Sequence, residues 1–479
     1  MSRHEGGGGA SGGDHARAGI GTGSTDGTAT GTGTGRTGGS CAGTGRWGCT
    51  GFTGRSGSRG RSGTSTGTSS GGIGGRGPDP GGATVAALRR ATRGARPAVE
   101  VSLVVEQLRR TVPGGIGTYC WGLLAGLGTL VAEGTAVPAV ELVASATRER
   151  PDPLTSWGLP VHAVGLAGPV LTRLWDRGST AGVRGSVVHA SSLAAPSGRG
   201  RALVVTVHDL GWRQVPDAYP RRGRRWHEAA FARARAQARR LVVPSVAVAD
   251  AVVATGVDAA RVVVVEHGGD HLPPPDHVAT AALLQRLGVT GSFMLAVGTL
   301  EPRKNLVRLV EAHRRAQDHL PEPCPLVIVG PSGWGGGVPG GGGVPGGGGV
   351  PGGGGVPGGG GVPGGGAVLA GAVPAPVLAG LYHRACLLAY VPLLEGFGLP
   401  PLEAMSAGTP VVSSPVPSTG GAALEVDPTD VAAIAAALVT VATDDRARGD
   451  LVAAGQRRAA ARTWRASAEE HVALWASLQ

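Results

Sequence analysis

From residue 99 onward, short apolar runs alternate with longer stretches whose apolar residues recur at helical spacing. "VEVSLVVE" has the length and β-branching of a buried strand, and in the segment after "GGIG" Tyr119, Leu123 and Leu127 lie on one helical face. Further strand-like runs lie at 139–143, 186–189, 202–208, 241–244 and 261–266, and the clearest helical stretch is 227–240. This alternation predicts an α/β fold with a parallel sheet and helices on both faces.

A second alternating series follows the proline-rich segment "HLPPPD" at 271–276. Its strand-like runs are 292–298, 325–330, 367–373, 386–391 and 409–414, and its helical stretches are 305–316, 375–385 and 400–407, before two C-terminal helices. Roughly 380 ordered residues exceed what one core usually serves. We therefore expect two Rossmann-like domains, 97–275 and 276–460, facing across a cleft, with the helix of 461–479 packing back on the first.

Two segments have almost no large apolar residues. Residues 1–96 are rich in Gly, Ser, Thr and Arg, and residues 336–366 repeat Val-Pro-Gly with a period of six. Neither can bury enough apolar surface to offset the entropy of ordering. We predict that residues 1–96 form a disordered tail; a wrongly assigned start of the chain or a simple-sequence expansion explains this segment equally well. We predict that residues 336–366 form a flexible surface loop.

Charge and cysteine content limit the function classes. The net charge of +11 comes almost wholly from arginine and favours anionic partners. Five scattered cysteines without a CxxC pair argue against a zinc site or a disulfide framework and favour a reducing compartment. We identify no apolar signal region and no charge-free apolar run of the roughly 18 residues that a membrane helix needs. The prediction is a cytoplasmic protein, with peripheral contact with the inner face of the cell membrane as a further option.

In open α/β sheets, ligands bind beyond the carboxyl ends of the strands. The first domain places three candidates there: the glycine loop 114–117, His189, and His208 with Asp209. The glycine loop precedes a helix, so its backbone N–H groups can approach a phosphate or sugar closely, although it is not GxGxxG. A buried structural role is the more common one for each histidine.

The second domain has a basic pair in the same kind of position. "VGTLEPRKNL" leaves a strand near Gly298 and enters a helix near Asn305, which is a candidate N-cap. Arg303 and Lys304 therefore stand beside a helix N-terminus, where an anion is favoured over the alternative of a solvated basic turn. Lys304 is the only lysine of the chain and Asn305 the only asparagine.

"EGFGLPPLEAMSAGTPVV" carries two carboxylates eight residues apart. Pro401 suits the first turn of a helix and Gly408 its end, which places Glu395 on a loop and Glu403 on that first turn. Together they could accept hydrogen bonds from sugar hydroxyls near an anion-binding helix end. The alternative is a solvated loop acid and a glutamate that complements its helix dipole.

"EGFGLPPLE" resembles the E-x7-E element of retaining GT-B glycosyltransferases, in particular glycosyltransferase family 4 and its bacterial mannosyltransferase-like members. "GGIGTY", "HASSLAAP", "VTVHDL", "VVPSVAVAD", "VEHGGD", "VGTLEPRKNL" and "LVIVGPSGWG" occur in the order that this family shows. The resemblance implies transfer of a hexose, mannose favoured, from a GDP- or UDP-linked donor to a saccharide or lipid-linked acceptor with retention. It also implies that no metal or other cofactor is required.

The resemblance also implies roles for individual residues. Glu403 would bind the donor ribose, and Arg303 and Lys304 would stabilise the nucleotide diphosphate as a leaving group. Glu395 and His208 would lie by the transferred hexose. The remaining donor-binding groups would be the glycines of the first-domain loop and the backbone after Glu395: Gly115, Gly117, Gly396, Phe397, Gly398 and Leu399.

The sequence departs from the family pattern in two places. The segment after Ser414 is short and lacks a Pro-Glu pair that relatives usually carry, and the repeat at 336–366 interrupts the second domain. A degenerate, non-catalytic nucleotide-sugar or glycan-binding protein is therefore the alternative. A phosphorylase of similar fold would need a lysine beyond 304, which the chain lacks. The arginines of 221–240 suggest nucleic-acid binding. Two observations argue against this function: the chain has few aromatic residues that could stack on bases, and it has no recognised nucleic-acid-binding fold.

Overall fold

The computed structural model describes residues 100–331 and 366–479. The predicted disordered tail (1–96) and all but the last residue of the predicted repeat loop (336–366) lie outside these ranges.

The first part of the chain forms a seven-stranded sheet in the order β3-β2-β1-β4-β5-β6-β7, and every strand pair is parallel. Its strands are β1 (Val101–Val104), β2 (Val140–Ser145), β3 (Val161–Val164), β4 (Val187–Ala190), β5 (Ala202–Thr206), β6 (Arg240–Val243) and β7 (Val262–Val264). Its α-helices are α2 (Gly114–Ala132), α3 (Gly168–Asp176), α4 (Gly211–Gln214), α5 (Arg221–Gln237) and α6 (Val246–Val253). Short 3₁₀ turns are η1 (Glu106–Arg109), η2 (Pro153–Trp157), η3 (Pro216–Ala218) and η4 (Ala259–Arg261).

The second part forms a six-stranded parallel sheet in the order β10-β9-β8-β11-β12-β13. Its strands are β8 (Met294–Val297), β9 (Leu326–Val329), β10 (Ala367–Gly371), β11 (Leu387–Tyr390), β12 (Val411–Ser413) and β13 (Leu424–Glu425). The helices are α7 (His277–Arg286), α8 (Leu306–Gln317), α9 (Ala375–Arg384), α10 (Leu399–Ser406), α11 (Val431–Thr443), α12 (Asp445–Ala460) and α13 (Trp464–Ala476), with 3₁₀ turns η5 (Pro302–Lys304) and η6 (Pro417–Thr419).

The predicted α/β class is confirmed, because both sheets are parallel and alternate with helices along the chain. The predicted set has no counterpart for β3, β13, α3, α4, α6 or α7, and three helices (α11, α12 and α13) close the chain where two were expected. The strand β13 has only two residues, and two of the four residues of β3 are polar or small, so neither gives a clear apolar pattern. The exact domain limits stay a prediction.

Each sheet is covered by apolar side chains on both faces. In β1, Val101 and Leu103 join the cluster under α2, whereas Val104 joins the cluster under α5. In β8, Leu295 packs toward α9 and α10, whereas Met294 and Ala296 pack toward α8 and α11. Successive residues of a strand point to opposite faces, so strands buried on both sides read as continuous apolar runs.

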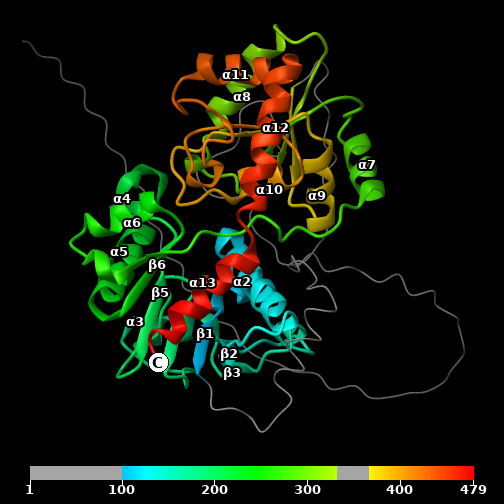
Figure 1. Cartoon of the computed structure of the whole chain (residues 1–479). Coiled ribbons are helices and arrows are strands. Elements are labelled where there is room, and N and C mark those ends of the chain that lie inside the picture. The colour runs from blue at the N-terminus through cyan, green and yellow to red at the C-terminus, as the bar shows by residue number, and fades with distance from the viewer. Residues whose placement is uncertain (1–99, 332–365) are drawn as a thin grey trace, which may run out of the picture. The chain divides into compact units, whose positions relative to one another are not determined.

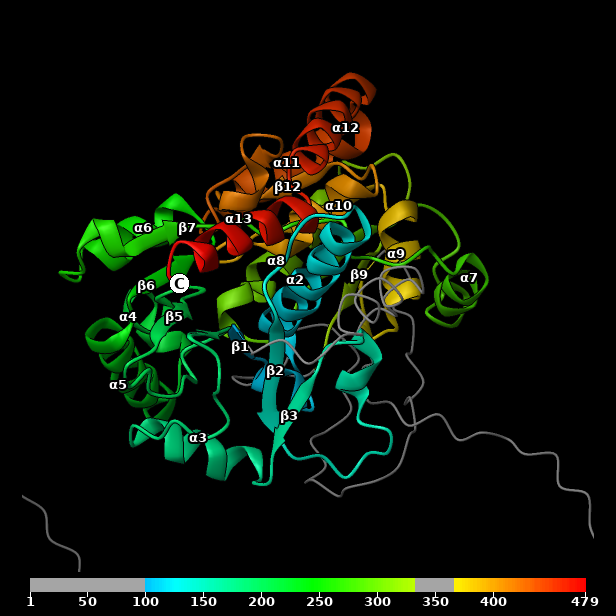
Figure 2. The ribbon, with the colours of Figure 1, turned by 60° about the horizontal axis from the view of Figure 1, so that its bottom comes forward.

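The expectation that no charge-free apolar run reaches membrane-spanning length is wrong. Helix α2 has 19 residues without a charged side chain, and it is the one described helix long and apolar enough to cross a membrane. More than half of that stretch is buried within the protein, where α2 lies along α13, the last helix (Figures 1 and 2). Its apolar length is thus explained by burial between the first sheet and α13.

Candidate functional site

The loop after β8 and the loop after β11 meet, because these two strands are neighbours in the second sheet. Nζ of Lys304 lies 2.6 Å from Oε1 of Glu395 and donates a second hydrogen bond, 3.0 Å, to the hydroxyl of Tyr390. The Lys304 and Glu395 side chains are 14% and 10% exposed. A nearly buried ammonium and carboxylate in direct contact is the centre of the candidate site.

Arg303 adds a second cation to the same carboxylate. Its Nη1 lies 3.2 Å from Oε1 of Glu395 and 3.7 Å from Oδ2 of Asp209, and its Nη2 donates to Glu301 at 3.1 Å. Its guanidinium also donates to the carbonyl of Leu394 at 3.2 Å. Asp209 follows β5, so this cluster includes a residue of the first sheet's carboxyl edge.

The charges of this cluster stabilise one another. Burial alone would raise the pKa of Glu395, but Lys304 and Arg303 lower it overall. Burial alone would lower the pKa values of Lys304 and Arg303, but Glu395 raises both. All three groups are therefore charged at neutral pH, and an incoming anion would find two cations that already share one carboxylate.

Asn305 stands at the N-cap position of α8, but the predicted side-chain cap is wrong. Its backbone is left-handed (φ 58°), and its side chain makes no capping hydrogen bond. Instead, Nδ2 donates to the carbonyls of Val391 at 3.0 Å and Pro428 at 2.7 Å, and Oδ1 accepts from Arg308 at 2.9 Å. Asparagine tolerates this backbone conformation better than most residues, and its amide ties the basic loop to the segment after β11.

Glu403 lies deeper than predicted. Helix α10 begins at Leu399, one residue before the predicted start at Pro400, which places Glu403 in the second turn, where the residue is only 6% exposed. Its Oε1 lies 3.1 Å from Nε2 of His271, and its Oε2 accepts a 2.6 Å hydrogen bond from Tyr382. Burial alone would raise the pKa of Glu403, but the hydrogen bonds from His271 and Tyr382 lower it overall. Gly408 ends the helix with a left-handed φ of 78°, in the predicted place.

The segment between the two glutamates packs closely against the first part of the chain. A side chain at Gly396 would overlap the carbonyl oxygen of His208, and the carbonyl of Gly396 accepts a 2.7 Å hydrogen bond from Ser245. The ring of Phe397 is buried 5.0 Å from that of His267, and Gly398 has a left-handed φ of 90°. Only glycine permits the backbone contact at 396. Leu399, half-buried, is the first residue of α10.

The two histidines named from the sequence occupy different environments. His208 is half-buried, its Nε2 lies 2.8 Å from the carbonyl of Ser191, and its backbone adjoins Gly396. Burial lowers its pKa, so its ring is neutral at pH 7. His189 is fully buried, with Nε2 2.9 Å from the Thr206 hydroxyl and Nδ1 accepting from Trp475 at 3.1 Å. His189 is a core residue.

Gly115 and Gly117 do not form a loop. Both belong to the first turn of α2, and among the described residues no hydrogen bond joins either to the charged cluster. The left-handed φ falls on Gly114 (61°), and a side chain at Gly117 would overlap Pro113. Glycine disfavours helix, which is why the sequence predicts a loop here, but the burial of the apolar face that follows outweighs that preference.

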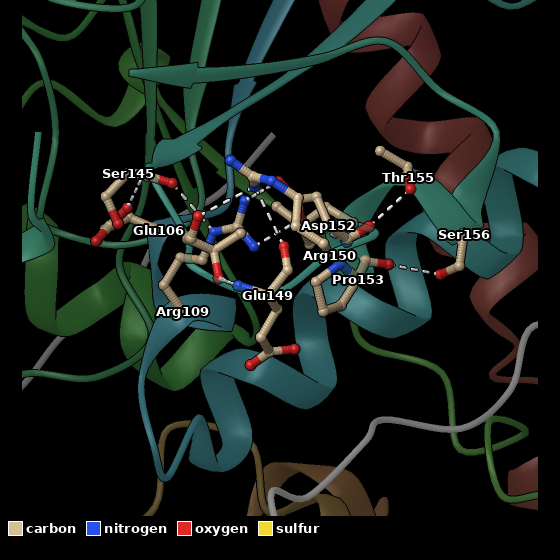
Figure 3. Close-up of polar contacts among 11 residues, drawn as sticks. Glu106, Arg109, Ser145, Glu149, Arg150, Asp152, Pro153, Thr155 and Ser156 are labelled. Atoms are coloured by element: carbon tan, nitrogen blue, oxygen red, sulfur yellow. Dashed lines mark hydrogen bonds and ion pairs between the residues drawn. The ribbon is translucent and has the colours of Figure 1, made fainter. Parts of the chain in front are cut away.

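A second polar cluster lies at the carboxyl ends of β1 and β2 (Figure 3). Arg109 forms a two-pronged ion pair with Asp152, at 2.7 and 2.6 Å, and donates to the carbonyl of Ser145. The backbone N–H of Ser145 donates to the buried Glu106 at 2.6 Å. These groups satisfy one another, so the cluster holds the 146–157 loop on η1 rather than presenting free groups.

Three partners of the proposed site residues were missed from the sequence: Tyr390, Tyr382 and His271. For the tyrosines, the sequence signal is their scarcity, because the chain has only four. Two of these four contact Lys304 and Glu403. The sequence prediction includes His271 only as the first residue of a proline-rich segment between the domains. The described residues contain no group of three His, Cys, Asp or Glu side chains that could hold a metal ion.

Family models match both halves of the chain. The model described as Glycosyltransferase Family 4 matches residues 113–271, and the model described as Glycosyl transferases group 1 matches residues 361–444. The two matches lie in the first and second sheet domains, in the order expected for one two-domain molecule. The chain is therefore a GT-B glycosyltransferase of the family-4 type, which is the class that the sequence resemblance predicts.

Individual relatives are similar to part or most of the chain. O-antigen chain mannosyltransferase B of Escherichia coli is 34% identical over 176 residues, which are 36% of this chain and 42% of that protein. The match thus spans less than half of this curated relative. The crystal structure of HepE from Anabaena, in complex with UDP and glucose, has a TM-score of 0.56 at 18% identity, covering 79% of this chain and all of that one. Sucrose-phosphate synthase from Thermosynechococcus elongatus has a TM-score of 0.56 at 19% identity, covering 79% and 98%. These two likenesses confirm the predicted two-domain fold.

Proposed function

We propose that this protein transfers a hexose, mannose favoured, from a GDP- or UDP-linked donor to a saccharide or lipid-linked acceptor with retention. The observation that carries the proposal is the buried cluster of Lys304, Arg303 and Glu395 at the carboxyl ends of adjoining strands. The matched mannosyltransferase supports the choice of sugar, and the nucleotide complexes of HepE support the donor class.

In the proposed reaction, the bond between the sugar C1 and the diphosphate oxygen breaks, and its electron pair leaves with the diphosphate. The acceptor hydroxyl oxygen bonds to C1 from the same face, and its proton passes to the departing diphosphate. Lys304 and Arg303 would stabilise the growing negative charge, for which two fixed cations in a water-poor site are well suited. This supplies the leaving-group stabilisation without a metal ion.

The remaining residues would bind the donor around that centre. Glu395 and the backbone of Gly396 to Leu399 would contact the hexose, His208 would lie beside it, and Glu403 would accept from the ribose hydroxyls. Gly115 and Gly117 would approach the diphosphate from the first turn of α2. The amide of Gly115 would be the donor, because the N–H of Gly117 already donates to the carbonyl of Pro113 at 3.2 Å.

A screen of GDP-mannose, UDP-glucose and UDP-N-acetylglucosamine with the purified full-length protein tests this proposal. We expect one donor to raise the melting temperature and to be hydrolysed slowly without acceptor, with undiminished activity in EDTA. NMR of the product's anomeric proton would establish retention. Binding without any turnover would favour the non-catalytic alternative, which the short segment after Ser414 motivates.

We also propose that the protein is cytoplasmic and contacts anionic membrane through α4 and α5. An open pocket of about 630 Å³ lies there, lined by Trp212, Arg213, Arg221, Arg224, Arg225 and Glu228. Arg213 is paired with Glu228, whereas the other three arginines form no ion pair with any residue of 100–331 or 366–479. Sedimentation with phosphatidylcholine vesicles, with and without phosphatidylglycerol, should show binding only to the anionic vesicles. Replacing Arg221, Arg224 and Arg225 by Gln should abolish it, whereas Arg314→Gln and Arg315→Gln on α8 should not.

A further inference from the structure

Trp464, His271 and Glu403 form a hydrogen-bonded chain from the last helix to α10. Nε1 of Trp464 donates to Nδ1 of His271 at 3.2 Å, and Nε2 of His271 lies 3.1 Å from Oε1 of Glu403. An indole N–H can only donate, so Nδ1 of His271 is the acceptor. The proton of the neutral ring is then on Nε2, which points it at Glu403. The indole thus selects the tautomer that donates to the carboxylate.

The carboxylate of Glu403 is held at both oxygens. His271 engages Oε1, and the hydroxyl of Tyr382 donates to Oε2 at 2.6 Å. An ionised carboxylate has about four lone-pair sites, so two donors leave room for two more. The pair of protein donors fixes the plane of the group while it remains an acceptor for a diol.

His271 belongs to the linker of residues 268–271, which contacts the start of α13 on one side and α10 on the other. Oδ1 of Asp270 accepts from the backbone N–H of Trp464 at 2.8 Å, and the N–H of Gly269 donates to the carbonyl of Arg462 at 3.1 Å. A side chain at Gly268 would overlap the backbone of Trp464, and one at Gly269 would come within 2.6 Å of Leu402. The "HGGD" glycines therefore let the linker pass between the start of α13 and α10.

We propose that His271, with its tautomer selected by Trp464, is the positioning residue that orients Glu403 toward the ribose hydroxyls of a nucleoside diphosphate. The inference rests on the proposed function of Glu403 and adds to it the route by which α13 and the linker act on nucleotide recognition. Without the donor on Oε1, the carboxylate would rotate about its bond to Cγ, and the alignment of its free lone pairs with the diol would be lost.

If His271 had a merely structural role, its replacement would have a different effect on nucleotide binding. Loss of a buried hydrogen bond lowers the melting temperature whatever the ligand. Loss of orientation changes the ratio of affinities for nucleotides with and without a ribose hydroxyl. That ratio is insensitive to a uniform loss of folded protein.

The experiment is titration calorimetry of the full-length protein with UDP or GDP, whichever binds more tightly, and with its 2′-deoxy and 3′-deoxy analogues. We expect the wild type to prefer the ribonucleotide about tenfold over at least one analogue, since a hydrogen bond to a charged group is at stake. His271→Ala should reduce that ratio to below about twofold. His271→Gln, whose Nε2 can replace the ring Nε2 as donor, should largely restore it. His277→Gln, at an exposed position on α7, should match the wild type.

Trp464→Phe removes only the indole donor and keeps a large ring. This variant therefore tests the positioning role of His271 if His271→Ala does not fold. In this variant, the ratio of the affinities for the ribonucleotide and the deoxy analogue should fall to about threefold. Wild-type discrimination in each folded variant would overturn the positioning role and leave the proposed function standing. A wild type that binds the ribonucleotide and both analogues equally would instead remove the ribose role from Glu403. Absence of any nucleotide binding would contradict the proposed function itself.

Discussion

The carboxylate of Glu395 lies 2.6 Å from the ammonium of Lys304, the only lysine of the chain, and both side chains are nearly buried. The same oxygen is 3.2 Å from Arg303. Without a ligand, Glu395 is therefore the counter-ion of the two cations that are proposed to bind the donor diphosphate. Diphosphate binding would compete with this ion pair and release Glu395 toward the transferred sugar.

Glu395→Gln should bind nucleoside diphosphate more tightly while losing transfer activity. Removing one member of a buried ion pair leaves the other uncompensated, at a cost of about 3–5 kcal/mol of stability, which a bound diphosphate would partly restore. We expect affinity for UDP or GDP to rise on the order of tenfold. Calorimetry and a thermal-shift titration measure both effects. Weaker binding than in the wild type would contradict the counter-ion role.

Lys304→Ala should lower transfer at least about 100-fold, because it removes charge stabilisation from the leaving group. The fold should persist, since Arg303 still pairs with Glu395. Steady-state kinetics with circular dichroism checks both statements, and Arg315→Ala on the exposed face of α8 is the matched control. Unchanged turnover in Lys304→Ala would remove the diphosphate role from this loop.

Asn305→Ala should destabilise the protein more than Asn305→Gly. Both lose the hydrogen bonds to Val391 and Pro428, but only alanine is strained by the left-handed backbone. We expect alanine to cost about 1 kcal/mol more than glycine in urea unfolding. Equal urea midpoints for the two variants would show that the left-handed backbone at residue 305 does not strain alanine.

Folding stability should fall between pH 6.5 and pH 4. Burial lowers the pKa of His471 to about 4, and its Nε2 contacts the hydroxyl of the buried Tyr119 at 2.9 Å. The unfolded chain takes up a proton as pH falls below about 6.5, whereas the folded protein does not until about pH 4. The contribution of His471 to stability is thus complete above pH 6.5, and this residue alone accounts for a loss of up to about 3 kcal/mol below it. Urea unfolding at several pH values should show a smaller loss in His471→Gln and an unchanged loss in His319→Gln.

Gly126→Ala should detach or destabilise α13, because the added methyl group would overlap the backbone carbonyl of Trp464. Relief would require movement of helix backbone, so we expect a cost above about 2 kcal/mol. Gly449→Ala, in the interior of α12 with open space around it, should instead stabilise the protein by about 1 kcal/mol. Melting curves of the two variants should shift in opposite directions.

The class of fold, and the places of Arg303, Lys304 and Glu395 between a strand and the next helix, follow from the amino-acid sequence alone. Apolar periodicity is a local property, so strands such as β8 and β11 and helices such as α8 and α9 could be placed without neighbours. Because the strands are parallel, residues after them gather at one edge, which predicts Arg303 and Lys304 as site residues. Glu395 is predicted from its loop beside the start of a helix.

The contacts between these groups, in contrast, depend on tertiary packing. Lys304 and Glu395 are 91 residues apart, and they meet because β8 and β11 are neighbours, an order that local pattern does not encode. The amide of Asn305 finds its two carbonyl partners in the same way, and Glu403 acquires His271 from a segment whose prolines suggested nothing but a break. Strand order and helix docking are set by the packing of whole faces, so they fix these distances where residue spacing cannot.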